Sequence, residues 1–182
     1  MPSPVALFPT LLDATDWSLL APAVQRMHAQ GRVIQASGVA EVDGARHVIA
    51  RLLRRVLTLP EPGAAQAIAL TIERHATHER WIRHFAHGLM CSTLRANDQL
   101  QLHERLGPVT LHFRLHRADD AIDWRLRRVT LMGLPLPKAL CGKVHSRSGS
   151  LNDRYAFEID THLPLVGQLI AYRGWLEIDH VI

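Results

Sequence analysis

Hydrophobic and polar residues alternate along most of the chain after Ala64, in short segments separated by turn residues about every eight to twelve positions. The clearest segment covers residues 109–116, in which every second residue is apolar: Val109, Leu111, Phe113 and Leu115. A period of two places successive side chains on opposite faces of a strand, so these four should point to the core. The pattern predicts an antiparallel meander with no further long helix.

A different spacing marks two helices before that point. Apolar residues recur three and four apart in residues 16–30, where Pro22 fits only a first turn, so the helix should begin near Pro22. Residues 32–42 then read as a strand with a bulge at Gly38. An amphipathic helix is predicted over residues 45–59, and we expect it to cover the sheet with Leu52, Leu53 and Val56 turned inward.

The later strands are interrupted at several places. The apolar phase changes at Arg127 and Arg128, which predicts a bulge. Two prolines in residues 133–137 exclude a central strand, so this stretch should be an edge or a loop leading to a short turn near residues 139–141. Residues 146–153 are polar and expected to be mobile, and residues 155–161 and 168–178 supply the last two strands.

Together these elements predict the α+β class. We expect a curled antiparallel sheet or half-barrel of about eight to nine strands, with an N-terminal helix and an amphipathic helix after the first strand. The absence of a linker, repeat or low-complexity segment predicts a single domain over residues 1–182.

The composition limits the classes of partner and the cellular location that we expect. Of the 21 basic residues only Lys138 and Lys143 are lysines, and the basic excess is spread over both halves of the chain. Without a basic block or a recognition motif, we expect no nucleic-acid partner. No apolar run approaches the length of a membrane span and no leader is recognised, so we expect a soluble cytoplasmic protein without a membrane partner. Two cysteines, Cys91 and Cys141, form no disulfide framework, and Cys91 is expected to pack in apolar surroundings.

Four segments carry a resemblance. The most specific is residues 163–176, and the others are residues 22–28, residues 79–81 with Arg83 and Phe85, and residues 133–137. In these segments the chain resembles a bacterial family catalogued as domain of unknown function 4166, often fused behind a saccharopine-dehydrogenase-like or epimerase-like NAD-binding domain. The resemblance implies an NAD-dependent oxidoreductase partner. It transfers no catalytic residue, because none is established for the family.

The candidate chemistry is sparse. The eleven glycines contain no GxG, so the chain lacks the phosphate-binding turn of a dinucleotide fold, and we expect no cofactor. Two HxxH spacings occur, His75 with His78 and His84 with His87. Residues three apart on a strand face opposite sides and could share a metal only across a turn, so we expect no metal site.

The most distinctive candidates are arginines set beside aromatic residues. Trp81, Arg83 and Phe85 share one strand face, and Arg173 and Trp175 share another. A buried guanidinium needs a partner, which is either a ligand carboxylate or phosphate, or a structural carboxylate such as Glu79, Glu158 or Glu177. We favour the structural interpretation for Arg83 and the ligand for Arg173. The predicted ligand-binding residues are Arg173, Tyr172, Trp175, Trp81 and Arg83.

The sequence therefore predicts an accessory domain that binds a small apolar or anionic molecule. We expect it to work with a separate NAD-dependent oxidoreductase. A binding role is favoured over an enzyme that acts on its own. Two alternatives stay open. One is an enzyme that uses the cavity for isomerase-like acid-base chemistry, with Arg173, Tyr172 and a histidine. The other is a purely structural docking domain.

Overall fold

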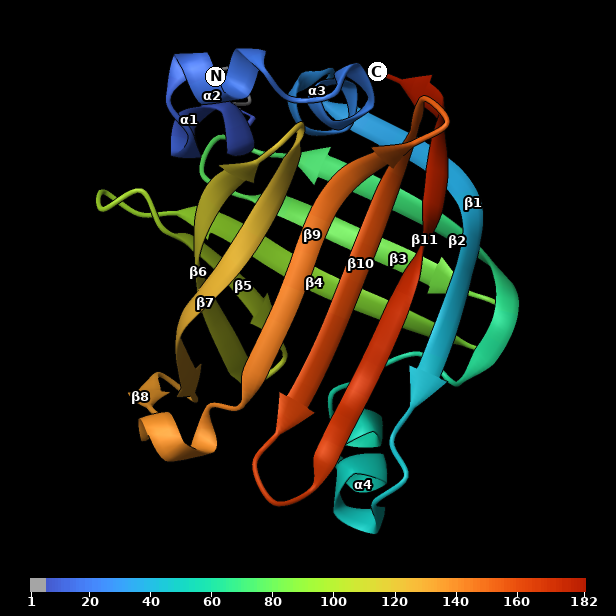
Figure 1. Cartoon of the computed structure of the whole chain (residues 1–182), viewed down its shortest axis with the longest axis vertical. Coiled ribbons are helices and arrows are strands. Elements are labelled where there is room, and N and C mark those ends of the chain that lie inside the picture. Colours follow the sequence, from blue (N-terminus) through green and yellow to red (C-terminus); the bar gives the residue numbers. More distant parts are fainter. Residues whose placement is uncertain (1–5) are drawn as a thin grey trace.

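The computed structural model describes residues 6–182, which fold as a closed antiparallel β-barrel with short helices at its two ends (Figure 1). Ten of the strands in these residues form the wall, in the order β6-β5-β4-β3-β2-β1-β11-β10-β9-β7, and β7 pairs with β6 to close it. The strands of the wall are β1 Val33–Gly44, β2 Gly63–Arg74, β3 Glu79–Phe85, β4 Gly88–Ala96, β5 Leu102–Leu106, β6 Val109–Ala118, β7 Ala121–Leu131, β9 Lys143–Leu151, β10 Arg154–Leu163 and β11 Gly167–Val181. An additional strand, β8 Leu134–Pro135, pairs with β7.

The prediction of a curled sheet or half-barrel of about eight to nine strands is wrong, because the sheet is closed and has ten strands in its wall. Closure comes from the pairing of the first and last strands, β1 with β11, from Ile34↔Val181 to Gly44↔Ile170, and from the pairing of β7 with both β6 and β9. Alternation specifies the buried face of a strand but not its neighbours. The helices are short, so the architecture is mainly β rather than α+β.

The contact between β1 and β11 depends on two glycines. A Cβ at Gly38 would collide with the carbonyl oxygen of Trp175, and a Cβ at Gly174 would collide with that of Val39. Gly38 is therefore required for close approach of two backbones, and the predicted bulge there is wrong. The register of β1 shifts instead between Gln35 and Ala36 against β11, and between Ala40 and Val42 against β2.

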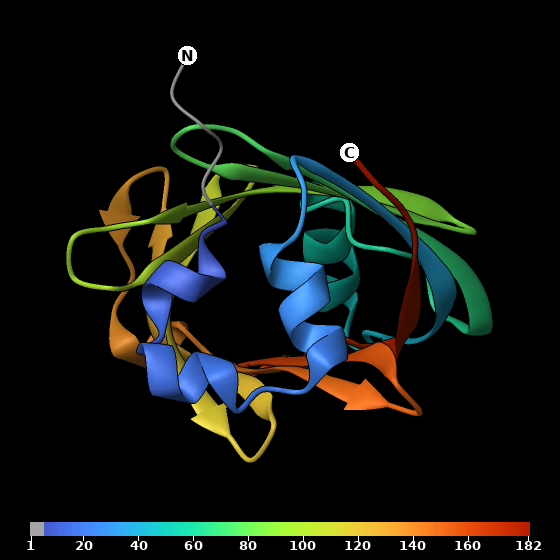
Figure 2. The ribbon, with the colours of Figure 1, turned by 90° about the horizontal axis from the view of Figure 1, so that it is seen from above.

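Three helices close one end of the barrel, as Figure 2 shows from above: α1 Phe8–Leu11, α2 Ala14–Ser18 and α3 Pro22–Ala29. Pro22 begins α3, as predicted, and Ala23, Val24 and Met27 are buried on the barrel. The fourth helix, α4 Val48–Val56, lies at the opposite end (Figure 1). Within residues 6–182, no helix is both long enough and apolar enough to cross a membrane.

The orientation predicted for α4 is wrong for Leu52 and Val56 and correct for Leu53. Leu52 is 61% exposed and Val56 60% exposed, while Ala50 and Arg54 are buried and Leu53 packs against the core. Arg54 fixes this orientation, because its Nη2 donates to the carbonyl of Pro60 at 2.7 Å. The helix thus turns one apolar side to the barrel and leaves another in solvent.

The strand predictions for β6 and its neighbours hold. Phe113 and Leu115 are buried, and Val109 and Leu111 are partly buried and line the interior. Arg127 has no partner between the pairs His112↔Arg128 and Phe113↔Leu126, which confirms the predicted bulge. Leu134–Pro135 is an edge strand, and a 3-10 turn, η1 Lys138–Leu140, follows it as expected. Residues 146–153, expected to be mobile, instead lie mainly in β9 and its turn to β10, and Ser146 and Ser148 are buried.

Candidate functional site

The barrel encloses a cavity of about 330 Å³. Most of the side chains around it are apolar and come from nearly every strand of the wall, together with Leu53 of α4 and Leu57 just after it. A small group of polar side chains also reaches it: Arg83, Glu104, Ser146, Ser148, Tyr155, Thr161 and Tyr172. An apolar pocket with a few placed polar groups is typical of sites for small organic molecules.

One polar cluster joins three adjacent strands. The Nη2 of Arg83 on β3 lies 3.3 Å from Oε1 of Glu104 on β5, and its Nη1 donates to the hydroxyl of Ser92 on β4 at 3.0 Å. The guanidinium carbon also lies 4.9 Å from the ring centroid of Trp81. The side chains of Arg83 and Glu104 are 9% and 10% exposed. The cluster therefore adds two charges of opposite sign to the cavity and no net charge.

A second cluster lies on the opposite wall. The hydroxyls of Ser148 and Tyr155 are 2.9 Å apart, and the indole Nε1 of Trp124 donates to Ser148 Oγ at 3.1 Å. Burial raises the pKa of Tyr155 to about 12, although the Ser148 hydrogen bond and the Arg83 charge oppose the shift. Burial also raises the pKa of Tyr172 to about 12 against the same Arg83 charge. Both phenols stay protonated at neutral pH and can donate hydrogen bonds.

The helical end of the barrel is locked by a buried ion pair. Arg74 Nε lies 3.2 Å from Glu79 Oε1, and both side chains are almost fully buried. Arg74 also donates to the carbonyls of Met27 and Gly31 at the end of α3. Glu79 accepts hydrogen bonds from the Leu7 backbone at 3.1 Å and from the Trp81 indole at 2.9 Å. Because each charge has several partners, this end is a structural closure rather than a free binding site.

His28 lies fully buried beneath this closure. Its ring stacks on Phe8 with the centroids 3.8 Å apart, and Tyr155 meets it edge-on at 5.4 Å. Within residues 6–182, neither ring nitrogen has a hydrogen-bond partner. Burial, and secondarily the charge of Arg74, lowers the pKa of His28 well below its usual value. The imidazole is therefore neutral and acts as part of the aromatic packing.

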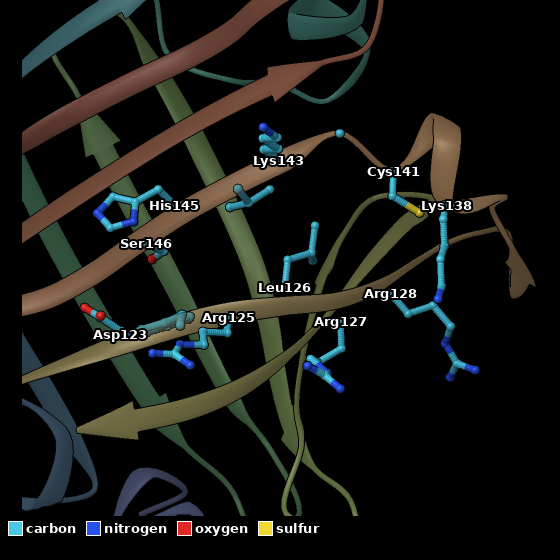
Figure 3. Close-up of a pocket in the computed structure, with 13 residues that line it drawn as sticks. Asp123, Arg125, Leu126, Arg127, Arg128, Lys138, Cys141, Lys143, His145 and Ser146 are labelled. Atoms are coloured by element: carbon cyan, nitrogen blue, oxygen red, sulfur yellow. The ribbon is translucent and has the colours of Figure 1, made fainter. Parts of the chain in front are cut away.

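The ladder between β7 and β9 is short, and the two strands diverge beyond it (Figure 3). These strands pair only from Ile122↔Ser148 to Arg125↔His145, and beyond that point residues 126–128 face residues 141–144 without a ladder. We call this gap the seam. On its outer side lies a groove of about 480 Å³ that is lined by Arg125, Arg127, Arg128, Lys138, Lys143 and His145, among others.

The structure separates the five residues predicted to bind a ligand. Trp81, Arg83 and Tyr172 line the cavity. Arg173 lies on the outer surface, where its Nε and Nη2 donate to Glu41 Oε2 at 3.0 and 2.8 Å. Trp175 is also outside, with the guanidinium of Arg154 stacked 4.2 Å from its ring centroid.

The carboxylate partners predicted for the two arginines are not those observed. Arg83 pairs with Glu104 and Arg173 with Glu41. Glu79 instead pairs with Arg74, and Glu177 pairs with Arg154. Glu104 stands 21 residues from Arg83 and Glu41 stands 132 residues from Arg173, so local sequence spacing could not identify these two partners.

Several cavity residues were not predicted, namely Glu104, Trp124, Ser148 and Tyr155. The sequence pattern could have identified Glu104, because it stands between Leu102 and Leu106 at the inward positions of β5. A single acidic residue in an apolar alternation indicates a buried carboxylate with a partner. Ser148 gave no such signal, since it lies in a run of polar residues.

Other candidate groups contribute no further site. His75 and His78 stack across the β2–β3 turn with centroids 4.5 Å apart. Within the part of the chain that the structure describes, no three His, Cys, Asp or Glu side chains are placed to hold a metal. Cys91 was expected to pack in the interior, but it is exposed on β4.

Comparison with known proteins identifies the family. The chain matches the family described as domain of unknown function (DUF4166) over residues 20–176. No curated protein matches it. The matched region begins just before α3 and ends within β11, so it spans every strand of the barrel wall. The chain therefore belongs to the DUF4166 family.

Proposed function

We propose that this barrel binds a small, largely apolar molecule in its interior. The observation that carries the proposal is the cavity of about 330 Å³, whose wall is mostly apolar and whose few polar groups converge on it from different strands. A well-packed core leaves few voids larger than a water molecule, so an interior space of this size indicates an occupant.

The polar groups indicate which part of such a molecule they recognise. Arg83 is already neutralised by Glu104, so an additional charge beside it would lack a counter-charge. The Tyr172 hydroxyl, protonated because its pKa is about 12, can donate to a carbonyl or hydroxyl oxygen. We infer that the inner end of the ligand is uncharged and carries an oxygen atom that can accept this hydrogen bond.

The geometry favours binding over a reaction. Among the described residues that line the cavity there is no histidine, and Arg173 lies outside. Tyr155 and Tyr172, each with a pKa of about 12, are poor general bases at neutral pH. The carboxylate that lines the cavity, Glu104, is paired with Arg83 at 3.3 Å. Among the described cavity residues, the acid-base alternative thus lacks an unpaired group poised to take a proton.

Native mass spectrometry of protein purified from its own host tests the proposal, because a co-purified small molecule adds a discrete mass. Isothermal titration with dodecanol and dodecanoate provides a second readout. We expect Leu111→Trp, which fills the cavity, to abolish binding, and Thr110→Trp, on the outer side of the same strand, to retain it. The proposal fails if no adduct is found and neither probe binds the unmodified protein.

We also propose an NAD-dependent oxidoreductase as the protein partner, with the exposed apolar side of α4 as the docking surface. Val48, Ile49, Leu52 and Val56 are each more than half exposed, and helices of monomeric proteins rarely leave such a stripe in water. Affinity purification from the host should enrich an oxidoreductase with the unmodified chain and lose it with Leu52→Glu. Equal recovery with both proteins would exclude this surface.

A further inference from the structure

The outer groove and the cavity share part of their lining along the seam. Four residues, Trp124, Cys141, Val144 and Ser146, line both spaces. Leu126 points into the gap from β7 in Figure 3, and Lys143 stands across it at the start of β9. A ligand could therefore lie partly in the cavity and partly in the groove without crossing a strand.

The bulge in β7 explains why the wall opens here. Arg127 is the extra residue, and a bulge bends its strand and increases its twist. The edge of β7 that would continue along β9 instead pairs with β8, at Thr130↔Pro135 and Leu131↔Leu134. The seam is thus a consequence of strand geometry rather than of one missing side chain.

The groove carries a concentrated positive charge. Arg125, Arg127, Arg128, Lys138 and Lys143 are all exposed, and within residues 6–182 none of them has an acidic side chain within 4.0 Å. The acidic residue of the groove, Asp123, is held by Arg147 at 2.9 Å. These charges also act on nearby groups: burial, followed by the charges of Arg125, Arg114 and Arg127, lowers the pKa of His116.

The difference in charge between the groove and the cavity indicates which end of a ligand each space would hold. The cavity holds one neutralised ion pair, whereas the groove holds five cations that have no acidic partner among residues 6–182. We propose that the seam is an anion site and that the ligand is an anionic amphiphile. Its carboxylate or phosphate lies among Arg127, Arg128, Lys138 and Lys143, and its hydrocarbon chain passes between Leu126 and Val144 into the cavity. This inference rests on the proposed function.

Four ligands that share a dodecyl chain and differ in their head groups test the site. Dissociation constants are measured by isothermal titration for dodecanoate, dodecyl phosphate, dodecanol and dodecyltrimethylammonium. In the test variant, Arg127, Arg128 and Lys143 are replaced by Gln. In the control variant, Gln replaces Arg32, Arg95 and Arg105. These three arginines are exposed and lie outside the groove and the cavity, and their replacement changes the net charge by the same amount.

We expect the test variant to bind both anions about ten-fold or more weakly, since each charge-assisted contact contributes about that factor. Dodecanol should bind both variants as it binds the unmodified protein, and the cationic probe should bind the unmodified protein more weakly than dodecanol. Unchanged anion binding in the test variant overturns the seam site while leaving the cavity proposal intact. If none of the probes binds the unmodified protein, the proposed function fails first.

The two cysteines locate the ligand independently. Cys141 lines the seam, whereas Cys91 is exposed on β4 and lines neither space. Alkylation with iodoacetamide is followed at each residue by peptide mass spectrometry, with and without dodecanoate. We expect dodecanoate to slow the modification of Cys141 several-fold and to leave Cys91 unchanged. Binding without protection of Cys141 would place the anion elsewhere and overturn the proposal.

Discussion

Two arginines that each stand two positions from a tryptophan occupy opposite environments. Arg83 follows Trp81 by two positions and lies inside the barrel against Glu104. Arg173 precedes Trp175 by two positions and lies outside against Glu41, with its side chain 62% exposed. The energetic roles must differ accordingly, because a buried pair is strongly coupled and an exposed pair is screened by water.

We predict that Arg83→Met lowers the free energy of unfolding by about 3–5 kcal/mol, because Glu104 is left buried without a counter-charge. The double variant Arg83→Met, Glu104→Met should recover most of that loss. Urea denaturation measures both, and Arg173→Met serves as the matched control with an unchanged midpoint. A single variant as stable as the unmodified protein would show that water or a ligand, rather than Arg83, compensates Glu104.

His28 predicts a loss of stability in acid. Its folded pKa is depressed, so between about pH 6.5 and that lower pKa the unfolded chain binds a proton that the folded protein does not. In this window acidification favours unfolding, by about 1.4 kcal/mol per pH unit from this group. His28→Phe removes the effect and breaks no hydrogen bond. The urea midpoint should therefore fall less between pH 7 and pH 5 for His28→Phe than for the unmodified protein. An equal fall in both proteins would show that His28 does not cause the acid sensitivity.

At the scale of the element, α4 shows how a correct pattern can give a wrong orientation. The apolar positions of residues 45–59 cover two sides of the helix, and period alone does not say which side packs. The structure resolves this through Arg54, whose hydrogen bond to Pro60 turns Leu53 toward the cavity and Leu52 toward solvent.

A pair of adjacent substitutions tests that orientation. Leu53→Asp should destabilise the protein by about 2–4 kcal/mol, because the carboxylate meets an apolar wall. Leu52→Asp should change the free energy of unfolding by no more than about 0.5 kcal/mol, since the side chain is 61% exposed. Thermal and urea unfolding of the two variants measure the difference. Equal losses would mean that both sides of α4 are packed.

Local signals in the sequence predicted the local features. The alternation in β6, the start of α3 at Pro22, the bulge at Arg127 and the edge strand at Leu134–Pro135 all follow from residue types within a few positions. The candidate site was less predictable. Tyr172 and Arg173 were both proposed, yet neighbours on a strand face opposite sides, so the cavity could take only one of them.

At the scale of the whole molecule, the segments that carry the family resemblance lie at structurally critical places. Residues 22–28 form most of α3, and residues 79–81 supply the Glu79 and Trp81 contacts of the locked end. Residues 133–137 include β8 beside the seam. Residues 163–176 form the hairpin that closes the barrel against β1. Closure joins the two ends of the sequence, which is why no local pattern could reveal it.

The same topology predicts where the barrel opens. The β1–β11 ladder extends over the length of β1, whereas β7 and β9 pair over only four residues each. Local opening requires the least free energy where few backbone hydrogen bonds must break. We therefore expect amide hydrogen exchange to be fastest, among the wall strands, at residues 126–129 and 143–144, which lie beyond the β7–β9 ladder and outside the pairing with β8, and slowest in β1 and β11. Dodecanoate should slow exchange at the first two segments and leave β1 and β11 unchanged. Exchange that is uniform around the barrel, or slowest at the seam, would show that β7 and β9 are held together by contacts other than their short ladder.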